Sequence, residues 1–393
     1  MSHSASIRSF RQLTDLADRG GPVVTLFSGG LDSTYLLLRL KELGVTDIHA
    51  VSVDLGEDES LEHKIQIADA IGVRLHVFDR REEFAQNYVL PALFAHAVYL
   101  GIHPISSSLS RPLIAKTAVE LAGEIGAKTI LHTANRSQNT LRRLNSALEL
   151  LGFQGDFGSP YDLDPVDREQ KIQELKNAGI DHLNDRLTSG DSNLWCREFE
   201  SGILDDPEDH AVPESIYRWS STAQRPPTDV TVTYEHGVPV AIDGVRKPFV
   251  DLIEELNFTA GAYGLGRYSG LEHLDHGEKV LEIREMPAAW LLLRSSRHLE
   301  SACLDAESIR EKMHIEQAWV RESLEGRWFG PLHEALQSFV DTCARSVSGS
   351  VTWRLSPGTA TTRAILADNP LYIRDREHWE RTSIAAESAA FAS

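Results

Sequence analysis

The pattern of hydrophobic and polar positions changes near the middle of the chain. In the first half, short apolar runs rich in β-branched residues alternate with segments whose apolar residues recur every three or four positions. The runs predict strands at residues 23–27, 47–56, 73–79 and 128–134, and the periodic segments predict helices at residues 31–40, 61–72, 93–102 and 112–126. This alternation specifies an α/β fold with a parallel, doubly wound sheet, helices on both faces, and ligands at the carboxyl ends of the strands.

The second half carries different signals. Residues 229–244 alternate apolar and polar positions around a His-Gly turn, which predicts a β-hairpin. Residues 247–266 predict a helix that runs into a glycine-rich loop, and residues 308–326 predict an amphipathic helix. We therefore expect one α/β domain over residues 1–180, an α+β domain over residues 181–360, and an arm or tail over residues 361–393.

Composition restricts the class of partner. The chain has 393 residues, 41% of them hydrophobic and 25% charged, which is ordinary for a protein with a full hydrophobic core. The formal charge of −19 argues against a nucleic-acid partner, because phosphate backbones need a basic surface. No long apolar run predicts a membrane helix or a signal peptide, so we expect no membrane partner. The widely spaced Cys196, Cys303 and Cys343 form no metal-ligand pair or disulfide framework, which favours a cytoplasmic enzyme of small molecules.

The sequence SGGLDST, at residues 28–34, stands where the first predicted strand meets the first predicted helix. A tight turn before a capped helix would explain it, since glycine tolerates positive φ and Asp and Ser cap helix starts. A strand, a glycine loop and a helix N-terminus also direct several backbone N–H groups and a positive dipole end at one point. We therefore predict an anion site there, for phosphate. The spacing fits neither GxGxxG nor GxxxxGK[ST].

The stretch SGGLDST resembles the pyrophosphate loop of the ATP pyrophosphatase superfamily, whose members cleave ATP between the α and β phosphates. The resemblance implies a nucleotide-binding domain of the adenine nucleotide alpha hydrolase type, with ATP and Mg²⁺ as cofactors. Asp32 and Ser33 would be catalytic, and Asp32 would help to hold the metal. The residues expected to contact ATP are Leu26, Phe27, Ser28, Gly29, Gly30, Leu31, Asp32, Ser33 and Thr34.

Three further stretches are similar to one family of that superfamily, the argininosuccinate synthases. HPISSSLSRPLIAK, residues 103–116, looks like the family's YLLGTSLARPLIAK. SNLWCREFESGILDDP, residues 192–207, looks like its DENLW…EGGILEDP, and YGLGRYSGLE, residues 263–272, looks like its HGVGRxDxVE. The resemblance implies an α+β synthetase domain and a C-terminal helix that supports a homotetramer.

In that family the ureido oxygen of citrulline attacks the α-phosphorus of ATP, and the amine of aspartate then displaces AMP. Carried over position by position, the resemblance places nucleotide contacts at Val53 and Thr133 and a catalytic arginine at Arg111. It implies that Arg143 holds the carboxylate of citrulline and that Glu272 holds the ammonium group. The other positions expected to contact the substrates are His103, Ser107, Ser108, Asn135, Asn139, Thr140, Ser189, Glu198 and Arg284.

Several of these positions depart from the family. His103 and Arg284 replace tyrosines, while a threonine, an aspartate and a serine of the family are replaced by Asn135, Thr140 and Glu198. The family's HGATGKGND loop reads HTANRSQNT at residues 132–140, without its glycines and its lysine. We expect this loop to take another path around its ligand, because the lost glycines gave access to positive φ.

Four of the charged or polar positions also have structural explanations. Glu198 and Arg284 can neutralise each other in a salt bridge that fills the space of the lost serine and tyrosine. His103 can be a surface or capping histidine. Arg111 can pair with a carboxylate at the end of the sheet, although a buried arginine in a phosphate site is the sharper expectation.

We therefore expect an ATP-dependent C–N ligase, a divergent member of the family that adenylylates a ureido or carboxylate substrate and joins it to an amino acid amine. The changed charges favour substrates other than citrulline and aspartate, because mismatched polar groups reject the old ligand. A true argininosuccinate synthase is the alternative.

Enzymes of other classes fit less well. The charge and the lack of paired cysteines disfavour a tRNA-thiolating enzyme, and Ser2 after Met1 disfavours a glutamine amidotransferase, which needs a cysteine there. The intact SGGLDST disfavours a catalytically silent regulator. The amphipathic segment of residues 308–347 is longer than a monomer needs to cover its sheet, which favours a homo-oligomer.

Overall fold

The computed structural model describes residues 6–56, 60–180, 188–274 and 277–391. Its N-terminal half is built on a five-stranded sheet in the order β3-β2-β1-β6-β7, in which every pair of neighbours is parallel. The strands are β1 Val23–Leu26, β2 Ile48–Asp54, β3 Arg74–Asp79, β6 Thr129–Leu131 and β7 Asp156–Gly158. The parallel sheet predicted from the alternating pattern is confirmed.

Helices connect these strands, because a parallel connection needs a crossover. They are α2 Leu31–Glu42, α3 Leu61–Ile71, α6 Ser107–Ile125 and α7 Thr140–Leu150, while α1 Thr14–Arg19 precedes β1 and α8 Arg168–Asn177 follows β7. Short 3₁₀ turns lie outside these connections: η1 Phe10–Leu13 precedes α1, η3 Pro160–Asp162 follows β7, and η4 Gly202–Leu204 and η5 Glu214–Ile216 belong to the C-terminal half.

One predicted helix is wrong over most of its length. A helical segment made of α4 Arg81–Phe84, the π-helical turn η2 Ala85–Val89 and α5 Leu90–Phe94 ends where the helix of residues 93–102 was expected to continue. His96 then takes a φ of 42° and Leu100 a φ of 49°, which an α-helix cannot include. The strands β4 Val98–Tyr99 and β5 His103–Pro104 form a small hairpin there.

The C-terminal half contains two antiparallel sheets. One has the order β12-β11-β10-β15-β16, and the other has the order β13-β14-β9-β8. The strands of the first are β10 Thr228–Glu235, β11 Val238–Ile242, β12 Val245–Arg246, β15 Gly349–Ser356 and β16 Thr359–Ala367. Those of the second are β8 Ser189–Ser192, β9 Arg197–Glu200, β13 Arg267–His273 and β14 Lys279–Glu285. The predicted hairpin is confirmed as β10 and β11.

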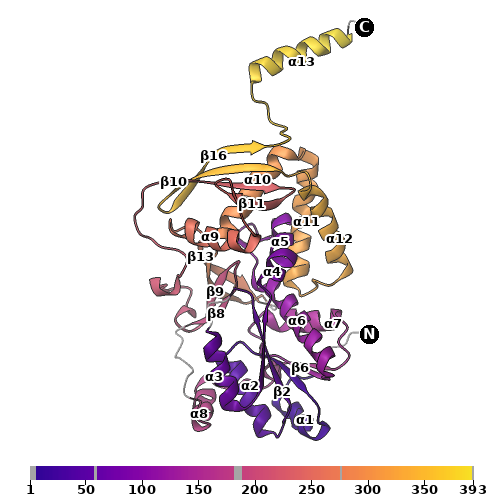
Figure 1. Cartoon of the computed structure of the whole chain (residues 1–393), viewed down its shortest axis with the longest axis vertical. Coiled ribbons are helices and arrows are strands. Elements are labelled where there is room, and N and C mark those ends of the chain that lie inside the picture. Colours follow the sequence, from indigo (N-terminus) through magenta and orange to yellow (C-terminus); the bar gives the residue numbers. More distant parts are fainter. Residues whose placement is uncertain (1–5, 57–59, 181–187, 275–276, 392–393) are drawn as a thin grey trace.

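Helices cover these sheets and extend from them. They are α9 Phe249–Gly261, α10 Pro287–Cys303, α11 Ala306–Leu324, α12 Pro331–Ala344 and α13 Arg376–Phe391. Figure 1 shows the parallel sheet at one end of an elongated molecule, the larger antiparallel sheet towards the other end, and α13 standing away from both. The expected domain division at residue 181 falls among residues 181–187, outside the described part, and stays a prediction.

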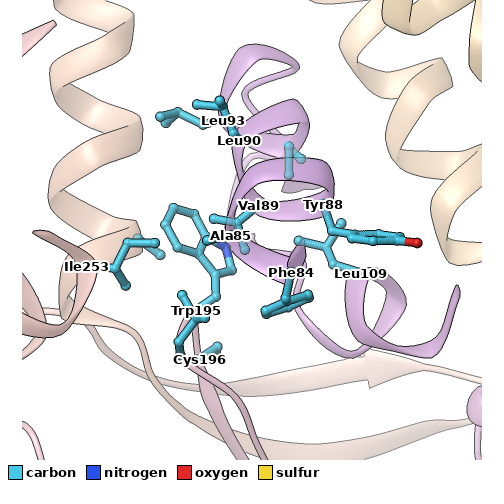
Figure 2. Close-up of a cluster of buried hydrophobic side chains, with 14 of the residues drawn as sticks. Phe84, Ala85, Tyr88, Val89, Leu90, Leu93, Leu109, Trp195, Cys196 and Ile253 are labelled. Carbon is cyan, nitrogen blue, oxygen red and sulfur yellow. The ribbon is translucent and has the colours of Figure 1, made fainter. Parts of the chain in front are cut away.

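A shared hydrophobic core holds the two halves together. The largest cluster of buried side chains includes residues of both, from Val24 of β1 to Trp353 of β15. Figure 2 shows the indole of Trp195, which is 1% exposed, between Ile253 of α9 and Ala85 and Val89 of the π-helical turn. Because this core is continuous, side chains from both halves can form one rigid site.

Candidate active site

The SGGLDST loop joins the carboxyl end of β1 to the N-terminus of α2, where the sequence predicted it. Gly29 has a φ of +78°, at which other residues are strained, and a Cβ atom there would lie 3.0 Å from the side chain of Lys64, so glycine is favoured. The hydroxyl oxygens of Ser28 and Ser33 lie 3.2 Å apart, and Ser33 donates to the carbonyl oxygen of Gly30 at 3.1 Å. The first N–H groups of α2 have no partner within the helix, so the loop fits a phosphate anion.

The other predicted nucleotide contacts lie on strands beside this loop. Leu26 pairs with Val51 of β2, so that Val53 lies just beyond it on the neighbouring strand. Thr133 follows β6, the other neighbour of β1. Phe27 and Thr34 are buried, and within the described residues the hydroxyl of Thr34 has no hydrogen-bond partner.

Asp32 is the loop's acidic residue, in the first turn of α2. Its carboxylate lies 2.5 Å from the ammonium group of Lys171 on α8. No cluster of three or more His, Cys, Asp or Glu side chains that could hold a metal ion occurs in the described residues. A single loop carboxylate fits Mg²⁺, which proteins commonly bind through one or two carboxylates together with substrate phosphates.

A cavity of about 430 Å³ lies between the two halves. Its walls come from the β4–β5 hairpin, the N-terminal turns of α6 and α7, the strands β13 and β14, and the C-terminal end of α11. Seven of the predicted substrate residues line it: His103, Ser107, Ser108, Asn139, Arg143, Glu272 and Arg284. The structure therefore brings together residues that lie far apart in the sequence.

Arg143 and Glu272 form an ion pair in the wall of this cavity. A guanidinium nitrogen of Arg143 lies 3.6 Å from a carboxylate oxygen of Glu272, and another donates to the hydroxyl of Ser107 at 2.8 Å. The side-chain amide of Asn139 donates to the same carboxylate at 3.3 Å. Burial raises the pKa of Glu272, but the charges of Arg143 and Arg284 outweigh it and keep the pKa low.

Two buried polar atoms of the cavity lack a partner. Within the described residues, the hydroxyl of Ser108 and the side-chain carbonyl of Asn139 make no hydrogen bond. Leaving such groups unpaired costs about 1–3 kcal/mol each, so a polar ligand that pairs with them would be stabilised. The cavity thus offers a cation, a carboxylate and two unused hydrogen-bonding groups to an amino-acid-like molecule.

Arg284 is neutralised within the protein. Its guanidinium lies 2.5 Å from Glu198 of β9 and 2.5 Å from Glu282, and all three side chains are at most 6% exposed. It also donates to the carbonyl oxygen of Pro104 at 3.1 Å. Burial raises the pKa of both glutamates above the ordinary value despite the arginine. The salt bridge between Glu198 and Arg284, which the sequence suggested as one explanation, is present. Glu282 adds a second carboxylate that sequence reasoning missed.

His103 is part of the buried wall, so its interpretation as a surface or capping histidine is wrong. It is 3% exposed, and its ring lies between those of Tyr99 and Tyr268. Burial and the nearby charge of Arg284 lower the pKa of His103 to about 3. The imidazole is therefore neutral at physiological pH and donates through Nδ1 to the carbonyl oxygen of Pro104 at 3.2 Å.

Arg111 lies outside the residues that line the cavity. Its guanidinium makes an ion pair of 2.5 Å with Asp191 of β8 and donates to the hydroxyl of Thr140 at 3.3 Å. Ser189 is exposed on the same strand, and Asn135 accepts a hydrogen bond from the backbone of Ser137 within the loop of residues 132–140. Sequence analysis considered that Arg111 pairs with a carboxylate, and the structure contains such a pair with Asp191.

Sequence reasoning missed a carboxyl group at the edge of this region. Glu200 of β9 lies opposite Ser189, and burial together with the charge of Glu272 raises its pKa to about 7. It also missed Asp191 and Lys171, which pair with predicted catalytic residues. Acidic and basic residues are frequent along the chain, so position alone gave no signal that these would be buried partners.

Comparisons with known proteins show that most of the chain is similar to one group of enzymes. Residues 22–181 match the Arginosuccinate synthase N-terminal HUP domain, and residues 188–390 match the Arginosuccinate synthase C-terminal domain. The argininosuccinate synthase of Dictyoglomus thermophilum is 36% identical over 338 residues, which cover 85% of this chain and 85% of that protein. That of Rubrobacter xylanophilus is 36% identical over 94% of this chain and 92% of its own length. That of Pyrococcus furiosus is 33% identical over 89% of this chain and 86% of its own length.

Among the described residues, no helix combines the length and the apolar character that a membrane crossing requires.

Proposed function

The chain belongs to the argininosuccinate synthase family, and from this premise we propose that it adenylylates a ureido or carboxylate substrate and joins the activated carbon to an amino acid amine. It is an ATP-dependent ligase that forms C–N bonds and converts ATP to AMP and pyrophosphate. The observation that carries the proposal is the SGGLDST loop between β1 and α2, together with the polar cavity lined by Arg143 and Glu272.

We assign the roles of the residues from their contacts. The N–H groups at the start of α2 and the hydroxyls of Ser28 and Ser33 would hold the departing pyrophosphate. Mg²⁺, when bound at Asp32, would neutralise charge on the phosphates. Arg111 would bind a phosphate oxygen in exchange for Asp191, since its fork matches both groups.

The cavity would hold an α-amino acid head. Its carboxylate would lie on Arg143 and its ammonium group on Glu272, whose lowered pKa keeps it ionised. The two side chains now lie 3.6 Å apart, so a zwitterion would replace a pair that already has the right charges. Ser108 and Asn139 would supply hydrogen bonds to the same substrate.

We propose that the preferred substrates differ from citrulline and aspartate. Thr140 removes a carboxylate that the family uses, and Arg142 and Arg321 line the end of the cavity formed by α11. Arg142 already lies 3.5 Å from the carboxylate of Glu325, so the exposed Arg321 is the cation at this end that would favour a substrate with a further negative group.

Argininosuccinate synthesis itself is the second candidate. It is favoured by the pairing of Arg284 with Glu198 and Glu282. This pairing cancels the positive charge that Arg284 brings in place of the family's tyrosine. With that charge neutralised inside the protein, a neutral ureido group meets no unpaired cation at this position.

One assay separates these functions. Purified protein is incubated with ATP, Mg²⁺ and a panel of ureido or carboxylate acceptors and amino acid donors, and AMP and pyrophosphate are measured. Release of ADP and orthophosphate instead would contradict the ligase. A kcat/KM of about 10⁴ M⁻¹s⁻¹ or more for citrulline with aspartate would establish the second candidate.

We further propose a homo-oligomer, a tetramer by family resemblance, in which α13 packs on another copy. Trp379 and Ile384 of this helix are 50% and 64% exposed, which is a large apolar surface on a helix that stands away from both sheets in Figure 1. Sedimentation that shows only a 43.7 kDa species at micromolar concentration would contradict this. We place the protein in the cytoplasm, where its free cysteines would stay reduced.

A further inference from the structure

A buried lysine approaches the pyrophosphate loop from a helix that the sequence did not connect with it. Lys171 of α8 is 8% exposed, although lysine side chains are almost never buried without a partner. Its ammonium group lies 2.5 Å from a carboxylate oxygen of Asp32, which stands 139 positions earlier in the chain. The contact is therefore a product of the fold rather than of local sequence.

The surroundings fix this lysine in place. Its ammonium group lies 5.3 Å from the ring centre of Tyr161, whose hydroxyl donates to the backbone carbonyl of Asp32 at 2.9 Å. The helix α8 is anchored by Leu175, which is fully buried, and by a hydrogen bond of 2.7 Å between Tyr35 of α2 and Glu174. Both partners of the Lys171–Asp32 pair are thus held by the same two helices.

The charge of Asp32 is a difficulty for an anion site. The loop must hold a pyrophosphate that carries several negative charges, and the Asp32 carboxylate in the same loop repels them. A second buried lysine, Lys64, directs its ammonium group to the hydroxyl of Ser52 at 2.9 Å. Lys171 is the lysine whose ammonium group contacts the loop's own acidic side chain.

We propose that Lys171 is a positioning residue of the ATP site, which cancels the charge of Asp32 and orients its carboxylate so that the loop can hold pyrophosphate. This rests on the proposed use of the loop for ATP. The pair leaves the second carboxylate oxygen of Asp32 available, since the 2.5 Å contact involves Oδ1 alone.

Binding of inorganic pyrophosphate to the full chain tests this without any amino acid substrate. Isothermal titration, with and without Mg²⁺, compares the wild type with Lys171→Met and Lys171→Gln, which remove the charge. We expect either substitution to raise the Kd for pyrophosphate by about tenfold to a hundredfold, the range for a lost charged hydrogen bond. Lys171→Arg should stay within about threefold of the wild type, because it keeps the charge. The matched control is Lys176→Met, an exposed lysine on the same helix, which should leave the Kd unchanged.

A double substitution shows whether Lys171 acts through Asp32. In an Asp32→Asn background, Lys171→Met should change the Kd by less than about threefold, because there is no charge left to cancel. An equal loss in both backgrounds would overturn the charge-balancing role.

The structural alternative gives a different result. If Lys171→Met and Lys171→Gln lower the thermal unfolding midpoint but bind pyrophosphate as the wild type does, Lys171 is only a brace between helices and the inference is wrong. If the wild type itself binds neither ATP nor pyrophosphate, the proposed function fails, and this inference fails with it.

Discussion

The pyrophosphate loop and the cavity that Arg143 and Glu272 line are formed in different ways. The loop is formed by nine consecutive positions, residues 26–34, and its shape follows from one strand, one helix and a glycine with positive φ. The cavity draws its walls from segments between Tyr99 and Glu325. A contiguous motif therefore specifies its own geometry, whereas the meaning of a cavity residue depends on which distant residue lies beside it.

Charge shows this difference most clearly. Arg284 resembles a substrate-binding cation when it is considered alone, but Glu198 and Glu282 neutralise it. Glu272 also lies near arginines, yet it keeps the lowered pKa and the cavity exposure that a ligand-binding carboxylate needs. The same residue types are structural in one place and available for binding a few ångströms away.

Removing Arg284, the cation that pairs with the buried Glu198 and Glu282, should have the largest effect. Arg284→Met leaves two glutamates buried without a partner, and we expect the free energy of unfolding to fall by about 3–5 kcal/mol. Chemical denaturation measures this free energy of unfolding. Arg246→Met breaks the exposed pair with Glu235 and serves as a control, in which no measurable change is expected. An Arg284→Met protein as stable as the wild type would mean that the three charges do not depend on one another.

Removing the loop carboxylate should lower turnover. We expect Asp32→Asn to lower kcat by about a hundredfold, because the carboxylate would act on the transition-state charge through Mg²⁺ and an amide would not hold the ion. Steady-state release of pyrophosphate measures this. Asp69→Asn, on an exposed position of α3, is the matched control. An unchanged rate in the Asp32 variant would remove this side chain from the mechanism.

Arg143 tests whether the cavity recognises a carboxylate through the shape of its cation. Arg143→Lys keeps the charge and loses the planar fork, so the Kd of the amino acid substrate should rise by about tenfold to a hundredfold. The Kd of ATP, measured on the same protein, should not change. A parallel loss of ATP binding would instead indicate that the cavity had collapsed.

The sequence predicted the loop and most of the sheet because these depend on local rules. Apolar runs and helical periodicity located β1, β2, β3 and β6, and SGGLDST located the turn. The helix expected through residues 93–102 was wrong because positive φ at His96 and the pairing of β4 with β5 override the periodic pattern. Partners such as Lys171 for Asp32 could not be predicted, since 139 positions separate them and the pairing arises only when α8 packs on α2.

The smallest expected effect concerns Glu200, which is the last residue of β9 and forms a hydrogen bond with Gln138 of the loop at residues 132–140. Burial, with the charge of Glu272, raises its pKa to about 7, above the ordinary value of 4.5. Between these two pH values the folded protein holds this proton more tightly than the unfolded chain does. This contribution to stability is therefore present at low pH and is lost as the pH rises towards about 7.

Buried histidines make stability rise with pH, which is the opposite of the effect of Glu200. The effect of Glu200 must therefore be isolated by substitution. Burial lowers the pKa of His132 to about 4, and its contribution to stability rises as the pH increases from about 4 to 6.5. Glu200→Gln removes only the glutamate component. We expect the variant to gain about 1 kcal/mol relative to the wild type between pH 5 and pH 8, after allowance for solvent at this partly exposed side chain. Unfolding midpoints at the two pH values measure this gain, and parallel profiles for the two proteins would show that Glu200 ionises as an ordinary surface carboxyl does.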